Sequence, residues 1–104
     1  MKKEELLQLV KKAIKEIEPD ADIILYGSRS TGRASAESDW DFLILVDGPV
    51  DFRRTDKIRH RLYEIEWDTG EVLCSIVRSR EEWQKPISKI MPFFQSVERD
   101  GIMI

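Results

Sequence analysis

A glycine-serine pair in the first half of the chain could form a turn that binds phosphate. Gly27 and Ser28 directly follow a short apolar run at residues 22–26. Glycine has no Cβ, so a bound group can approach the Gly27 backbone closely, and Ser28 offers a hydroxyl and an N–H. If a helical turn begins there, its first N–H groups lack internal partners and favour an anion. Arg29 and Arg33 would add positive charge beside it.

Two aspartates follow this turn after ten intervening residues, and their spacing could hold a metal ion. Asp39 and Asp41 open a second apolar run. On a strand, alternate residues share a face, so both carboxylates would lie on one side and Trp40 on the other. Two close carboxylates repel each other unless a cation or a proton separates them. Oxygen ligands of this kind suit Mg²⁺, which also binds substrate phosphates.

Each of these motifs taken alone has a simpler explanation. A glycine-serine pair is usually a turn, and an Asp-x-Asp triplet usually lies on a solvated strand edge. Here both stand at the ends of apolar runs, joined by a linker without large apolar residues. The combination favours one functional site to which both motifs contribute.

The apolar periodicity predicts an α/β (α+β) fold in which strands position these groups. Helices are expected at 4–17, 52–67 and 87–97, and strands at 22–27, 40–46 and 72–77, with a helical turn and loop at 29–38 and a short last strand near 100–103. A helix separates the second and third strands, as a parallel crossover requires. We therefore expect a small mixed sheet with helices packed on one face, in one domain spanning 1–104.

Side chains outside the two motifs are mostly explained by packing. The expected core face of the 52–67 helix consists of Ile58, Leu62 and Ile65, with Phe52 and Tyr63 as further candidates. Trp67 and Trp83 are interpreted as packing anchors, Ser79 as a helix N-cap, and Phe93-Phe94 as a cover for the sheet or an interface. A basic stretch on the same helix is either a solvated face or a docking surface for a partner: Arg53, Arg54, Lys57, Arg59 and Arg61.

Composition excludes several classes of protein. The 104 residues carry a formal charge of −3, which argues against a strongly basic nucleic-acid scaffold, and we have no direct indication of nucleic-acid binding. The single cysteine permits no intrachain disulfide, and with His60 alone it permits no Cys/His metal cluster. The charged N-terminal residues do not resemble a signal peptide, and no apolar run is long enough for a membrane span. We expect a soluble cytoplasmic protein without a membrane partner.

The two motifs together resemble a known family. Gly27-Ser28, ten residues and Asp39-Trp40-Asp41 are similar to the G-S-x10-D-x-D motif of the DNA polymerase beta-like nucleotidyltransferase superfamily. The fuller string resembles the minimal nucleotidyltransferases, which are often paired with a HEPN-domain protein in toxin–antitoxin modules. The resemblance implies a nucleotidyltransferase fold and transfer of a nucleoside monophosphate, with ATP as the expected donor, to a hydroxyl group with release of pyrophosphate.

The same resemblance implies roles for individual residues. Gly27 and Ser28 would hold the nucleoside triphosphate, Arg29 or Arg33 would neutralise it, and Asp39 and Asp41 would bind Mg²⁺. The implied partner is a HEPN-domain protein, and a homo-oligomer is left open. The acceptor and the preferred base do not follow from the sequence.

One position departs from the family pattern. The superfamily has a third acid on the next strand, and the corresponding position here is Cys74, a soft ligand where Mg²⁺ prefers oxygen. Glu66, Asp68 or Glu71 could substitute for that acid. The alternative function is therefore a non-catalytic module that binds a nucleotide or neutralises a HEPN-type partner by contact.

Overall fold

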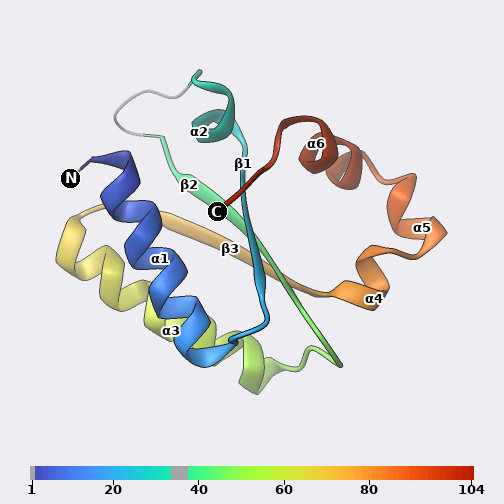
Figure 1. Cartoon of the computed structure of the whole chain (residues 1–104), viewed down its shortest axis with the longest axis horizontal. Helices are drawn as coiled ribbons and strands as arrows, with labels where there is room; N and C mark the ends of the chain where they lie inside the picture. Colours follow the sequence, from blue (N-terminus) through green and yellow to red (C-terminus); the bar gives the residue numbers. More distant parts are fainter. Residues whose placement is uncertain (1, 34–37) are drawn as a thin grey trace.

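Four strands in the order β3-β2-β1-β4 form one mixed sheet in the computed structural model, which describes residues 2–33 and 38–104 (Figure 1). Strand β2 is antiparallel to β1 and parallel to β3, and the short β4 pairs antiparallel with β1. The predicted mixed sheet and its parallel crossover are confirmed. The strands are β1 (Asp22–Tyr26), β2 (Trp40–Val46), β3 (Leu73–Ser79) and β4 (Ile102–Met103).

The two long helices lie side by side over one face of the sheet (Figure 1). They are α1 (Lys3–Ile17) and α3 (Phe52–Thr69), and both bury one apolar stripe. The core between them and the sheet includes alternate residues of β2, among them Trp40, Phe42 and Ile44. Because the strand alternates, the residues between them, including Asp41, lie on the opposite face.

Two of the short helices, at residues 80–83 and 92–100, cover part of that opposite face. Helices therefore pack on both faces of the sheet and not on one face as predicted. Leu43 and Leu45 of β2 pack there against Trp83 and Val97, which are buried as well. Phe93 and Phe94 pack against this second cluster, so their predicted role as a cover for the sheet is confirmed. The short helices are α2 (Ser28–Thr31), α4 (Arg80–Trp83), α5 (Pro86–Lys89) and α6 (Pro92–Asp100). Among the helices of the described residues, none is long and apolar enough to cross a membrane.

Three local predictions are wrong. The expected helix at 87–97 is two helices, because Pro92 has no N–H to continue α5 and instead occupies the first turn of α6. On α3, Phe52 and Tyr63 do not join the core face, and Trp67 is no packing anchor: their exposed fractions are 82%, 59% and 90%. The predicted N-cap at Ser79 is confirmed, since its hydroxyl accepts from the Glu82 N–H at 3.0 Å.

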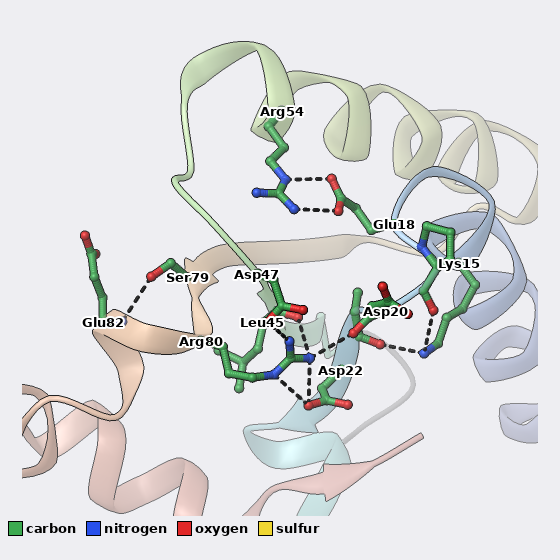
Figure 2. Close-up of polar contacts among 12 residues, drawn as sticks. Lys15, Glu18, Asp20, Asp22, Leu45, Asp47, Arg54, Ser79, Arg80 and Glu82 are labelled. Atoms are coloured by element: carbon green, nitrogen blue, oxygen red, sulfur yellow. Dashed lines mark hydrogen bonds and ion pairs between the residues drawn. The ribbon is translucent and has the colours of Figure 1, made fainter.

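Two arginines connect parts of the chain that are far apart in sequence (Figure 2). Arg54 of α3 donates to both carboxylate oxygens of Glu18, each at 2.7 Å, and so ties α3 to the end of α1. Arg80 donates to the Asp22 carboxylate at 3.0 Å, to the Asp47 carboxylate and to the Asp20 carbonyl at 2.8 Å. These contacts hold the edge of the sheet opposite the two sequence motifs.

The Arg54–Glu18 pair should make stability depend on pH in a defined window. The hydrogen bonds from Arg54 hold the pKa of Glu18 below its usual range. A carboxylate whose pKa is lowered by folding stabilises the protein at neutral pH, and this contribution disappears as the pH falls below about 4. Arg54→Leu should lower the free energy of unfolding by about 1–3 kcal/mol at pH 7, as expected for a lost charged hydrogen bond.

Urea denaturation at several pH values tests this prediction. The difference between wild type and Arg54→Leu should shrink as the pH drops below about 4. Arg99→Gln is the matched control, because the Arg99–Asp100 pair is on the surface and should contribute little. A difference that stays constant down to acid pH would assign the effect of Arg54 to packing and not to its charge.

Candidate active site

The two sequence motifs meet at one edge of the sheet. Strand β1 ends where the antiparallel β2 begins, and Tyr26 pairs with Asp41. Strand β3 runs parallel to β2 and begins at the same edge, where Asp41 pairs with Cys74. Gly27, directly after β1, therefore lies beside the aspartates and the cysteine.

Gly27 and Asp41 are in direct contact. A Cβ built on Gly27 would lie 2.5 Å from Oδ2 of Asp41, closer than real Cβ atoms approach other heavy atoms. Gly27 also has a φ of 76°, in the left-handed region that side chains disfavour. Both observations require glycine here, for the turn and for the close approach of the Asp41 carboxylate.

Side-chain hydrogen bonds keep the turn after Gly27 closed. The Ser30 hydroxyl donates to the Gly27 carbonyl at 2.7 Å, and the Thr31 hydroxyl donates to the Ser28 carbonyl at 3.3 Å. Ser28 is the first residue of α2, where backbone N–H groups have no partner within the helix. The sequence reasoning missed the roles of Ser30 and Thr31, although hydroxyls in a short turn commonly bond to nearby backbone.

The charges at this edge are poorly compensated. Burial raises the pKa of the Asp41 carboxyl, and the neighbouring Asp39 raises it further. Cys74 is exposed as a residue, yet partial burial of its thiol raises the pKa, with added contributions from Asp39, Asp41 and Glu66. The Cys74 Sγ donates a weak hydrogen bond to Oδ2 of Asp39 at 3.8 Å. Cys74 is thus a neutral thiol beside two carboxylates.

This donor set suits a hard cation held jointly by protein and nucleotide. Two carboxylates that repel each other would gain from a cation between them, and their oxygens are the ligands Mg²⁺ prefers. Among the residues that the structure describes, no group of three or more His, Cys, Asp or Glu side chains is placed to hold a metal ion. Asp39 and Asp41 therefore need further oxygen ligands, which nucleotide phosphates and water can supply.

The two arginines of the motif are placed differently from each other. Arg29 donates to the Ser38 carbonyl at 2.8 Å, and its guanidinium lies 4.2 Å from the centre of the Trp40 ring. These contacts connect α2 to the start of β2. Residues 34–37 of the linker between them lie outside the described residues. Arg33 is exposed, and its Nε donates to the Thr31 hydroxyl at 2.9 Å.

Three acids were considered as substitutes for the missing third carboxylate. Each of them either lies away from Asp39 and Asp41 or is hydrogen-bonded to another group. Glu71 accepts a hydrogen bond from the Trp40 indole at 2.9 Å, and Trp40 belongs to the other face of the sheet. Glu66 accepts from the Leu73 N–H at 2.9 Å, and Asp68 is exposed on α3. The position beside Asp41 is occupied by Cys74.

Tyr26 is a member of the site that the sequence reasoning did not single out. It pairs with Asp41, and its ring packs edge-on against Phe93 with centroids 5.2 Å apart. Burial and the charge of Asp41 raise the pKa of Tyr26 to about 12, so its hydroxyl stays protonated at neutral pH. The sequence could have indicated this role, because Tyr26 directly precedes Gly27 and the last residue of β1 borders the turn.

Three comparisons with known proteins find a matching family, a similar sequence and a similar structure. A family model described as a nucleotidyltransferase domain matches residues 7–98. A curated relative from Haemophilus influenzae, named "Probable protein adenylyltransferase MntA", is 28% identical over 97 residues, which cover 93% of this chain and 85% of the relative. A solved structure described as "Crystal structure of the toxin-antitoxin with AMP-PNP" matches with a TM-score of 0.65 and 16% identity, over 92% of this chain and 69% of that chain. At this identity the structural match supports the fold alone.

Proposed function

The chain belongs to the nucleotidyltransferase domain family, and we propose that it transfers AMP from ATP to a hydroxyl group of a protein partner or a small molecule. The observation that carries this proposal is the contact between Gly27 and Asp41, which brings the phosphate-binding turn against the acidic strand. The turn is suited to bind phosphate, and the carboxylates are suited to bind Mg²⁺. When both lie at the same edge of the sheet, they can act together on one nucleoside triphosphate. The named relative supports adenylyl transfer in particular.

Within this proposal each motif has one task. The Gly27-Ser28 turn binds the triphosphate through its backbone and the Ser28 hydroxyl, and the exposed Arg33 would exchange its hydrogen bond to Thr31 for the phosphates. Asp39 and Asp41 hold Mg²⁺, which would neutralise phosphate charge and polarise the α-phosphate when bound. Arg29 acts mainly by fixing the strand that carries the aspartates, given its contacts with Ser38 and Trp40.

The reaction needs few side chains. The acceptor oxygen forms a bond to the α-phosphorus, the bond from that phosphorus to the bridging oxygen breaks, and pyrophosphate leaves. The hydroxyl proton passes to solvent in this scheme, because Asp39 and Asp41 are assigned to Mg²⁺ and the Cys74 thiol is neutral. Cys74 also lines a cavity of about 240 Å³ between α3 and β3.

A protein of the HEPN type is the partner that we propose. A chain of the same fold comes from a structure described as a toxin-antitoxin with AMP-PNP, and this motivates our proposal of a two-component system and an adenine nucleotide. The second candidate function, a non-catalytic nucleotide-binding module, is favoured by one observation. Cys74 occupies the place beside Asp41 where a third carboxylate would serve transfer.

Mass spectrometry can separate the two functions. The protein is mixed with ATP, Mg²⁺ and the product of the adjacent gene, and transfer should add one AMP to that product. Asp41→Asn is the control and should abolish the added mass. ATP binding without any added mass would support the non-catalytic module, whereas absence of nucleotide binding would contradict both candidates.

A further inference from the structure

The outer face of α3 carries aromatic side chains that none of the described residues 2–33 and 38–104 covers. Phe52, Tyr63 and Trp67 are 82%, 59% and 90% exposed, and Asp56 lies between them in the helical repeat. With 3.6 residues per turn, these four positions fall within a sector of about 60° opposite the buried face. We call them the α3 ridge. Exposed tryptophan and tyrosine on a rigid element are typical of protein interfaces.

The charges of α3 are divided between its two halves. Residues 52–61 hold five Lys or Arg and one Asp, whereas residues 62–69 hold three acids and no Lys or Arg. The flank next to the ridge repeats this division with four exposed side chains, in the order Arg53, Lys57, Glu64 and Asp68, of which Glu64 also lies 3.5 Å from Arg61 of the same helix. A basic half followed by an acidic half is complementary to the same helix running in the opposite direction.

We propose that the α3 ridge is a homodimer interface, in which α3 packs antiparallel against α3 of a second copy of this chain. A two-fold axis next to His60 would place Arg53 opposite Asp68 and Lys57 opposite Glu64 of the second copy. The same register brings Phe52 against Trp67 of the second copy. Each contact occurs twice, as the symmetry of such an interface requires. This proposal does not depend on the proposed enzymatic function.

The size of the ridge indicates a weak dimer. Aromatic side chains bury about 150–250 Å² each, so the six rings of two copies bring the buried area to the order of 1,000 Å². This lies at the lower limit for specific interfaces, so we expect a weak dimer that forms mainly at high protein concentration. The flanking charges then mainly set the direction of the two helices, because exposed ion pairs add little energy.

Charge exchange on the flank tests the proposed register. Arg53→Glu would create two repulsive contacts with Asp68, one on each side of the two-fold axis. Asp68→Arg would likewise create two repulsive contacts with Arg53. Each single change should weaken dimerisation about tenfold, and the double change should restore it. Neither change opposes helix formation, because an acid in the first turn and a base in the last turn suit the helix dipole.

Sedimentation velocity from low micromolar to near-millimolar protein measures the outcome. Trp67→Ala should leave the protein monomeric at all of these concentrations, with unchanged thermal stability because Trp67 is exposed. Lys11→Glu, on the exposed side of α1, is the control and should dimerise like wild type. A monomeric wild type at every concentration would overturn the proposal, as would a double exchange that fails to recover dimerisation. Loss of binding to another protein in Trp67→Ala, with a monomeric wild type, would assign the ridge to that other partner instead.

Discussion

Replacing both Asp39 and Asp41 by asparagine is expected to abolish Mg²⁺-dependent nucleotide binding while leaving the protein folded. The amide keeps the size of the side chain and removes the charge that a divalent cation requires. Losing two charged contacts at about 1.5–3 kcal/mol each corresponds to an affinity loss of at least about 100-fold. Calorimetry with a non-hydrolysable ATP analogue, with and without Mg²⁺, measures this loss.

The stability of the same variant provides the control. The pKa of Asp41 is raised by burial and by Asp39, so its negative charge disfavours the folded state at neutral pH. Neutral asparagines should therefore keep or raise the melting temperature in the absence of ligand. Weaker binding with equal or higher stability identifies a functional charge pair, and unchanged binding would contradict the proposed site.

The part of the fold that could be predicted is the part that short-range hydrophobic patterns in the sequence specify. Alternation and apolar runs located the first three strands, because each strand buries one or both faces against the helices. The meeting of the two motifs was predictable because Gly27 directly follows β1 and Asp41 lies near the start of β2, and antiparallel pairing brings these strand ends together. The neighbour of Asp41 on β3 also agreed with its predicted position, Cys74.

The parts that were missed depend on contacts that no local pattern records. The amphipathic pattern of α3 identifies apolar residues but does not limit the width of the buried face, so Phe52 and Tyr63 were assigned to it wrongly. Arg80 connects Asp22 and Asp47, which lie far from it in sequence and have no periodic relation to it. The contact of Arg29 with Trp40 likewise needed the path of the chain around the linker.

Cys74→Asp is expected to raise nucleotidyl transfer, on the order of 100-fold. The structure places Cys74 beside Asp41 in the parallel register and its Sγ 3.8 Å from Oδ2 of Asp39, so an aspartate at this position would join the same cluster. A third carboxylate would supply a hard ligand and could accept the acceptor's proton, and one such group contributes about 10²–10³-fold to many enzymes. The natural protein should bind the nucleotide and transfer it slowly.

The cost of this substitution should appear in stability. Asp39 and Asp41 already raise the pKa of the Cys74 thiol, and a carboxylate there would experience the same repulsion as a charged group. We expect a lower melting temperature without ligand, which recovers when Mg²⁺ and nucleotide are added, because binding to the folded state stabilises it. Thermal unfolding with and without both ligands measures this recovery.

Cys74→Asn separates charge from size in this experiment. Asparagine matches aspartate in shape but supplies neither a charge nor a base, so it should leave transfer at the natural level. Pyrophosphate release by the three proteins, measured with one acceptor and equal Mg²⁺, compares them directly. If the natural protein is already fast and Cys74→Asp is slow, the third acid is located elsewhere or is unnecessary. If both variants bind the nucleotide but release pyrophosphate no faster than the natural protein, the chain is a binding module. Its lack of transfer activity then has a cause other than residue 74.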